Sequence, residues 1–236
     1  MDFERFESNR AKYGQCSSWA VWNQGACEYL GFEPDAGAAP GFFVNTSVRK
    51  LNAICSQRDL DGLGWRLNPN VVLVALNFAE RDERTKAATA GIHYHAFHEE
   101  TSLTSDQRLR DACCGTGLWG GYLTDLVKFD GDELTPFRSS KADPIIRRLR
   151  DPAFRQMQVS GLIKELEALG SRSPVVVALG NEVFSALNQT SSKQAISETL
   201  GGDTKILKVT HYSKAAGIRH SDYVAAVRRQ LRDHLD

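Results

Sequence analysis

Hydrophobic residues gather in four short runs, separated by longer stretches in which apolar positions recur with helical spacing. Two of the runs, residues 70–76 (NVVLVAL) and 174–179 (PVVVAL), are nearly continuous and rich in β-branched residues, which is typical of strands buried on both faces. Residues 120–127 (GGYLTDLV) and 205–209 (KILKV) are weaker candidates. The pattern therefore predicts four strands.

Two segments carry signals for helices. Asp151 before Pro152 predicts a helix start, because Asp accepts hydrogen bonds from first-turn amides and Pro suits that turn. The amphipathic pattern then continues to Gly170, and a further helix is predicted over residues 221–235. Its apolar face would consist of Val224, Val227, Leu231 and Leu235. Strands separated by helices favour parallel pairing, so we expect an α/β three-layer sandwich with a central four-stranded parallel sheet.

The composition fits one soluble domain over residues 1–236. Hydrophobic residues make up 42% of the chain, with 11 Phe and 4 Trp, which is enough for a large core and argues against disorder. We expect residues 70–236 to form the core of the fold and residues 1–69 to be an N-terminal elaboration that covers one edge of the sheet. The longest apolar run is far shorter than the roughly 20 residues of a membrane helix, so no membrane partner is expected.

Localisation and charge add weaker information. The acidic start MDFERFESNR does not resemble a secretory signal, and five cysteines without a C-x-x-C motif suggest reduced thiols, so we expect a cytoplasmic protein. The net charge is zero, but residues 1–136 carry six more acidic than basic residues and residues 137–236 six more basic than acidic. Such asymmetry can mark a surface facing a polyanion, or only a drift of surface charge. No obligate protein partner is indicated.

Polar residues follow the predicted strands, where parallel sheets collect their functional groups. Asn77 follows the first strand, Asp125 lies at the second, Gly180-Asn181 follows the third and His211 follows the fourth. No G-x-G-x-x-G follows a strand, and P-loop and G-x-S-x-G motifs are absent from the sequence, so those nucleotide-binding and hydrolase classes lack support. Each polar residue alone could be a cap or a surface side chain. Together they predict one polar crevice.

The order of these motifs resembles the uracil-DNA glycosylase superfamily. The matching segments within residues 70–235 are VVLVALNFA, GGYLTDLVK, VVVALGNEVF and VTHYSKAAG. Asn77 combined with His211 is most similar to the single-strand-selective monofunctional branch, and Asn77 alone also fits the mismatch-specific branch. The chain departs from the family pattern at Phe78 and Tyr212, where the family usually has Pro.

The resemblance implies a DNA glycosylase that acts on a base flipped out of the helix, with DNA as its partner. Asn77 would orient the attacking water, and His211 would donate a hydrogen bond to the base oxygen as negative charge develops there. This scheme requires neither a metal nor a cofactor. The DNA-binding positions would be Gly180, Asn181, Ser213 and Lys214. The base-binding positions would be Phe78, Ala79, Tyr94, Phe97 and Asp125.

Two of the base-binding positions indicate which base is removed. Ala79 occupies the place of a family Tyr that walls off the 5-position of the ring, so a 5-substituent would have room. The carboxylate of Asp125 would accept from the exocyclic amine of cytosine and repel O4 of uracil. Together they favour a 5-substituted cytosine, such as the glucosylated hydroxymethylcytosine of phage DNA, and the chain resembles anti-phage glycosylases. A uracil or mismatch repair glycosylase is the alternative.

Two further classes of function remain open. His93, His95 and His98, with Cys113 and Cys114 nearby in sequence, suggest a zinc site and a metal-dependent hydrolase, although no H-E-x-x-H or C-x-x-C spacing supports it. The same segment would otherwise supply Tyr94 or Phe97 to stack on the base. The missing prolines also suit a module that binds DNA without cutting it.

Overall fold

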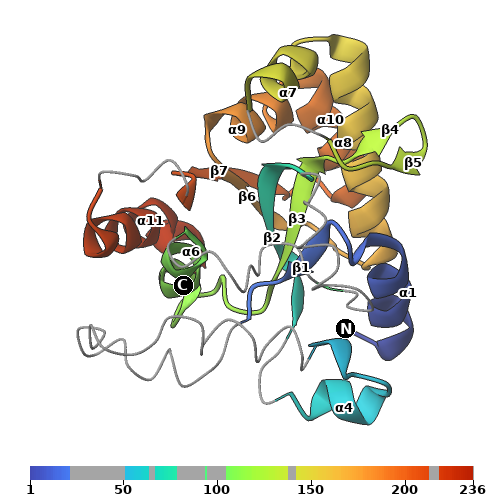
Figure 1. The fold of residues 1–236 in the computed structure, drawn as a ribbon, viewed down its shortest axis with the longest axis vertical. Coiled ribbons are helices and arrows are strands. Elements are labelled where there is room, and N and C mark those ends of the chain that lie inside the picture. The colour runs from blue at the N-terminus through green and yellow to red at the C-terminus, as the bar shows by residue number, and fades with distance from the viewer. Residues whose placement is uncertain are drawn as a thin grey trace.

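The computed structural model describes residues 1–21, 51–63, 67–78, 94, 105–137, 142–212 and 218–235, and Figure 1 shows a central sheet surrounded by helices. The helices are α1 (Phe3–Tyr13), α4 (Gln57–Asp61), α6 (Ser105–Cys113), α7 (Ala142–Leu149), α8 (Pro152–Ala168), α9 (Asn181–Leu187), α10 (Thr190–Leu200) and α11 (His220–Leu235). The strands are β1 (Ser17–Trp19), β2 (Asn68–Asn77), β3 (Gly121–Val127), β4 (Phe129–Asp130), β5 (Glu133–Leu134), β6 (Val175–Leu179) and β7 (Lys205–Val209).

The central sheet has the strand order β1-β3-β2-β6-β7. Strands β3, β2, β6 and β7 run parallel, which confirms the four strands and the parallel pairing that the sequence predicts. Strand β1 is an addition that the sequence pattern did not predict. It pairs antiparallel with β3 and places residues 17–19 at one edge of the sheet, where the N-terminal elaboration was expected.

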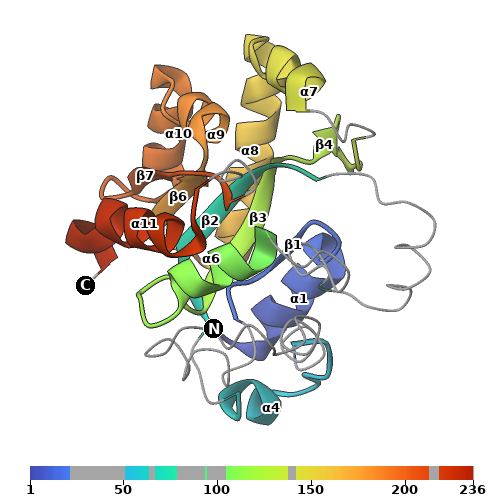
Figure 2. The same ribbon diagram turned by 60° about the vertical axis from the view of Figure 1, so that its left-hand side comes forward.

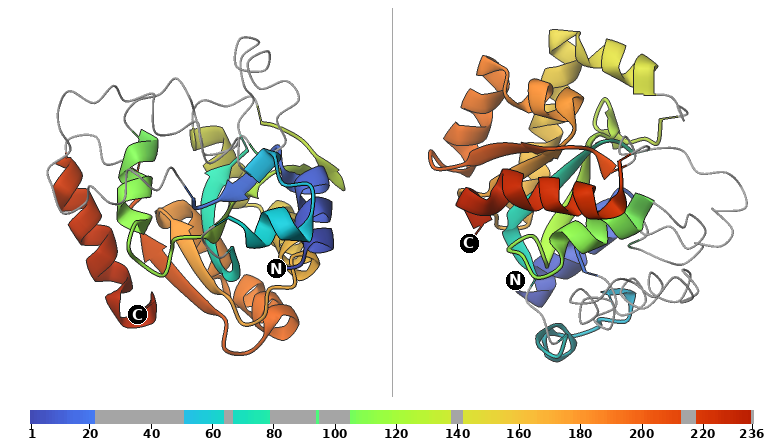
Figure 3. Two further views of the ribbon diagram at one scale, coloured as in Figure 1. Left: turned by 90° about the horizontal axis from the view of Figure 1, so that it is seen from below. Right: turned by 90° about the vertical axis from the view of Figure 1, so that its left-hand side faces the viewer.

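Helices cover both faces of the sheet, which gives an α/β architecture consistent with a three-layer sandwich (Figures 2 and 3). Helices α6 and α11 lie side by side over one face and share a core with alternate residues of the strands. Helices α1, α8, α9 and α10 pack on the other face around the larger core. The strands are hydrophobic on both faces because both faces are covered.

Helix α8 begins and ends where the sequence predicts. The side chain of Asp151 accepts a hydrogen bond from the amide of Ala153, and Gly170 follows the helix with a φ of 76°, a conformation that favours glycine. The inner face of the helix is not purely apolar, however. Gln158 is fully buried, accepts hydrogen bonds from the amides of Lys128 and Phe129, and donates one to the carbonyl of Phe129.

A buried ion pair joins α8 to the end of β3. Lys128 and Glu165 are both fully buried, and the ammonium of Lys128 contacts the carboxylate of Glu165. The other carboxylate oxygen accepts hydrogen bonds from the hydroxyls of Tyr122, at 2.6 Å, and Thr124, at 2.9 Å. The Tyr122 hydroxyl in turn accepts one from the side chain of Asn9 at 2.9 Å. This network links the sheet, α8 and the N-terminal helix α1.

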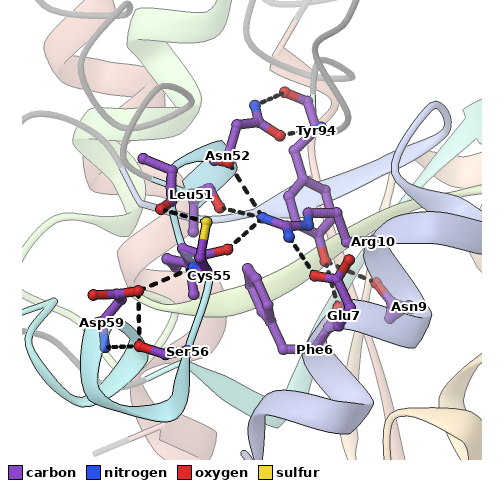
Figure 4. Close-up of polar contacts among 12 residues, drawn as sticks. Phe6, Glu7, Asn9, Arg10, Leu51, Asn52, Cys55, Ser56, Asp59 and Tyr94 are labelled. Atoms are coloured by element: carbon purple, nitrogen blue, oxygen red, sulfur yellow. Dashed lines mark hydrogen bonds and ion pairs between the residues drawn. The ribbon is translucent and has the colours of Figure 1, made fainter.

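Arg10 ties α1 to the segment around residues 51–54 (Figure 4). Its guanidinium donates to the carbonyls of Leu51, Asn52 and Ile54 and contacts the carboxylate of Glu7. One charged group thereby satisfies several carbonyls that a loop would otherwise leave without donors. The N-terminal elaboration is therefore anchored by polar contacts as well as by apolar packing.

Gly161 on α8 is predicted to tolerate no side chain. A Cβ at this position would overlap the buried ring of Phe129. Replacing Gly by Ala inside a helix normally gains about 1 kcal/mol, whereas overpacking a core costs about 1–3 kcal/mol. We therefore expect Gly161→Ala to lower the free energy of unfolding, measured by urea denaturation, by up to about 2 kcal/mol.

The matched control for this substitution is Gly202→Ala. A Cβ on Gly202 would meet no atom within 4 Å, so we expect a change within about 0.5 kcal/mol. A Gly161→Ala protein as stable as the wild type would show that Phe129 moves aside easily.

The structure bears on two expectations from the sequence, one about membrane helices and one about the cysteines. Among the helices described, none is long and apolar enough to cross a membrane. Cys16 and Cys55 carry free thiols, whereas Cys114 is disulfide-bonded. The expectation of five reduced thiols is therefore wrong for Cys114.

Candidate active site

The sheet register brings three of the predicted site residues to one end of the sheet. Asp125 on β3 lies opposite Ala75 on β2, and Asn77 lies opposite Val127, the last residue of β3. Because β2, β6 and β7 also pair in parallel register, continuing the Leu179–Val209 pair by two residues brings His211 level with Asn77. The carboxyl end of the sheet therefore holds Asn77 and His211 at the same height.

Gly180 directly follows β6, the strand that separates β2 from β7. Its amide donates to the carbonyl of Val209, and its φ of 105° favours glycine. A Cβ on Gly180 would lie 3.4 Å from the Cβ of His211. Strand β6 separates β2 from β7, so the backbones at Asn77 and His211 stand about 9–10 Å apart, the width of two strand spacings. Continued beyond the strand ends, the same register puts Gly180 level with Leu76 and Thr210, one residue below Asn77 and His211.

The ring of His211 is held by its neighbour in sequence. It stacks on the ring of Tyr212, with centroids 4.4 Å apart and planes inclined by 23°. Tyr212 packs against the core under α6 and α11, and the hydroxyl of Tyr223 on α11 donates to the carbonyl of Thr210 at 3.0 Å. Residues on both sides of His211 are therefore fixed to the α11 side of the sheet.

Asp125 lies inside β3 rather than at its end. The strand ends at Val127, as the sequence predicts, so Asp125 stands two residues before its end. The alternation of side chains nevertheless places Asp125 on the same face as Asn77, as its diagonal neighbour on the adjacent strand. Its carboxylate is buried, with 6% of the residue exposed. Asp125 therefore places a carboxyl group just below the end of the sheet.

Cys16 also lies near Asp125, but it is not suited to be a nucleophile. Burial, as the largest cause, raises the pKa of the Cys16 thiol well above its usual range, and the negative charges of Glu165 and Asp125 add to this effect against the opposing charge of Lys128. A thiol must ionise to attack or to bind a metal. Cys16 is therefore a packing residue of this region.

Phe78 and Tyr94 are not brought into the space between Asn77 and His211. Phe78 is buried in a small cluster with Tyr13, Cys16 and Phe129. Tyr94 is fully buried in the larger core, with its ring 5.6 Å from that of Phe6 and its hydroxyl donating to the side chain of Asn9 (Figure 4). Neither ring presents an open surface on which a base could stack.

Asn181 begins α9 immediately after Gly180, and it is exposed. It lines a cavity of about 280 Å³ between α7, α8 and α9. The sequence indicated Asn181 as a DNA-binding position, and the structure places this residue at a hollow on the surface. The arginines that share this hollow were not predicted.

A second polar cluster, absent from the sequence prediction, joins α6 to the start of α11. The carboxylate of Asp111 lies 2.6 Å from Nε2 of His220, and it also accepts a hydrogen bond from Nε of Arg110. Arg228 donates to the carbonyls of Asp111 and Cys114. Asp111 and His220 are 109 residues apart in the chain, so no motif spacing could have revealed the pair.

Several predicted positions lie outside the described residues. They are Ala79, Phe97, Ser213 and Lys214 of the proposed glycosylase site, and His93, His95 and His98 of the proposed zinc site. Within the described part of the chain, no three His, Cys, Asp or Glu side chains are grouped so that they could hold a metal ion.

Comparisons with known proteins leave the site to be interpreted from its own geometry. The chain matches no protein-family model, no curated protein and no solved structure.

Proposed function

We propose that the protein is a DNA glycosylase that hydrolyses the N-glycosidic bond of a flipped, modified pyrimidine and leaves an abasic site. The observation that supports this proposal most directly is that the sheet register, continued beyond the strand ends, brings Asn77 at the end of β2 and His211 just after β7 to the same height. A backbone separation of about 9–10 Å between Asn77 and His211 suits a flat ring held between a water on one side and a hydrogen-bond donor on the other.

The reaction needs little from the protein beyond positioning and charge stabilisation. Cleavage of the bond leaves an oxocarbenium-like sugar and an anionic base. The amide of Asn77 would orient the water that attacks the sugar, and the imidazole of His211 would donate a hydrogen bond to the base oxygen. Because the stacked Tyr212 restricts the ring of His211, this donor would need little reorganisation as the charge develops.

The preferred base in this proposal is a 5-substituted cytosine, with glucosylated hydroxymethylcytosine of phage DNA as the leading case. The support is the buried carboxylate of Asp125 on the same face as Asn77. A carboxylate accepts hydrogen bonds and does not donate them, so it matches the exocyclic amine of cytosine and not O4 of uracil. A biological role in defence against phage follows from this choice of base.

Abasic-site formation on a panel of DNAs tests the proposal. The panel contains phage DNA with glucosylated hydroxymethylcytosine, its unmodified counterpart, and single- and double-stranded DNA with uracil. We expect abasic sites in the modified phage DNA alone. Abasic sites in the uracil DNAs would instead indicate a repair glycosylase. Binding to every DNA without any abasic site would indicate a module that binds without cutting.

Asp125→Asn is expected to change the choice of base without abolishing activity. An amide both donates and accepts, so the variant no longer repels O4 of uracil. A mismatched hydrogen-bond pattern at one base is worth about 1–3 kcal/mol, so the ratio of kcat/KM for modified cytosine over uracil should fall about 5- to 150-fold. An unchanged ratio would contradict the role given to Asp125 and leave the glycosylase proposal standing.

A further inference from the structure

The cavity beside Asn181 has the side chains of an anion-binding site. Its walls come from the turn between α7 and α8 and from α9, and its volume is about 280 Å³. The polar lining residues are Arg150, Arg155, Asn181, Glu182, Ser185 and Gln189. Two arginines, two residues with amide side chains and one serine line the cavity, against one glutamate. The lining therefore carries a positive charge and many hydrogen-bond donors.

The two arginines differ in how they are held. Arg155 is partly buried in the first turns of α8, and its guanidinium donates to the carbonyl of Leu149 at 3.1 Å, which fixes it across the turn between the helices. Arg150 is exposed, and it follows α7 directly. A fixed guanidinium beside a more mobile one suits a phosphate group, because the planar fork of Arg matches phosphate oxygens.

The cavity adjoins the carboxyl end of the sheet through Asn181, which begins α9 directly after β6 and Gly180. Gly180 contacts the His211 side through its backbone, and the next residue, Asn181, lines the cavity. A polymer whose base lies between Asn77 and His211 would therefore run its backbone past Gly180 towards Arg150 and Arg155.

We infer that the cavity lined by Arg150 and Arg155 binds the phosphodiester backbone of the DNA strand beside the flipped nucleotide. This inference rests on the proposed glycosylase function for its choice of polyanion. The arginines were not among the DNA-binding residues expected from the sequence, and they extend the contact surface from the end of β6 to the turn between α7 and α8.

Salt-dependent DNA binding tests the inference. Fluorescently labelled single- and double-stranded oligonucleotides without a target base are titrated with the full chain over a range of KCl concentrations. We expect Arg150→Gln and Arg155→Gln each to reduce the slope of log K against log [KCl] by about 0.7–0.9, and the double variant by about twice that. Arg172→Gln, an exposed arginine next to the amino end of β6, removes the same charge and should leave the slope unchanged.

The outcomes separate this inference from the proposed function. If the double variant binds with the wild-type slope, the phosphate site is refuted, whatever the result of the abasic-site assay. If the wild type binds through the arginines but forms no abasic sites, the phosphate site stands and the glycosylase proposal fails. A third titration measures the binding of inorganic phosphate at matched ionic strength. If the arginine variants lose phosphate binding but bind DNA as the wild type does, the cavity is a site for free anions and the assignment to DNA is overturned.

Discussion

Asn77→Ala is expected to lower the rate of abasic-site formation by about 100- to 1000-fold, the range observed when a single polar group that acts on the transition state is removed. Asn77 stands at the last position of β2, half-buried, where its amide would hold the attacking water. Methyl in place of amide leaves the strand and its pairing intact, so we expect the stability to change by less than about 1 kcal/mol. His211→Ala should have an effect of similar size, because it removes the donor to the leaving base.

The control for this experiment lies on the same strand. Asn70 is exposed near the amino end of β2, and its side chain accepts a hydrogen bond from the amide of Arg172. Asn70→Ala removes the same functional group at the opposite end of the strand, so the rate of abasic-site formation should remain close to that of the wild type. Equal activity of the Asn77 and Asn70 variants on the modified DNA would rule out a role for Asn77 in the reaction.

Breaking the buried pair of Lys128 and Glu165 is expected to have the largest effect on stability. Glu165→Leu leaves the ammonium of Lys128 buried without a counter-charge and takes the acceptor away from Tyr122 and Thr124. The removal of one member of a buried pair costs about 3–5 kcal/mol. We expect a loss of that order in the free energy of unfolding, measured by denaturant titration.

A double-mutant cycle shows whether the loss comes from the stranded charge. Lys128→Met combined with Glu165→Leu removes both charges, and its loss should be smaller than the sum of the two single losses by more than about 1 kcal/mol. Arg219→Met serves as the control, because its pair with Asp222 is exposed and worth less than about 1 kcal/mol. Strictly additive losses at Lys128 and Glu165 would mean that the pair does not act as a unit.

The sheet was predictable because its strands carry their own signal. Residues 70–76 and 174–179 are apolar on both faces, and only a covered parallel sheet accepts such runs. The Asp-Pro start of α8 is likewise a local signal. Strand β1 carries none: Ser17–Trp19 is three residues long, and its pairing with β3 depends on residues far away in the sequence.

The candidate site was predictable only in part, for a related reason. Asn77 and His211 could be picked out because they follow predicted strands, and the position of a strand end follows from the length of the apolar run. The burial of Lys128 and Glu165 could not be predicted in this way, because nothing in the sequence distinguishes them from a surface lysine or glutamate. The ring of Tyr94 appeared available for stacking because its enclosure by Phe6 and Asn9 is a tertiary property.

The hydrogen bond between Asn9 and Tyr122 also has a consequence for how the chain folds during synthesis. The two residues are 113 positions apart, and at about 5–20 residues per second the ribosome needs roughly 6–23 s to make the intervening chain. Throughout that time α1 and β1 have no strand β3 to pair with. The N-terminal segment is thus made before its binding site on β3, and its docking is expected to be a late step in the maturation of the nascent protein.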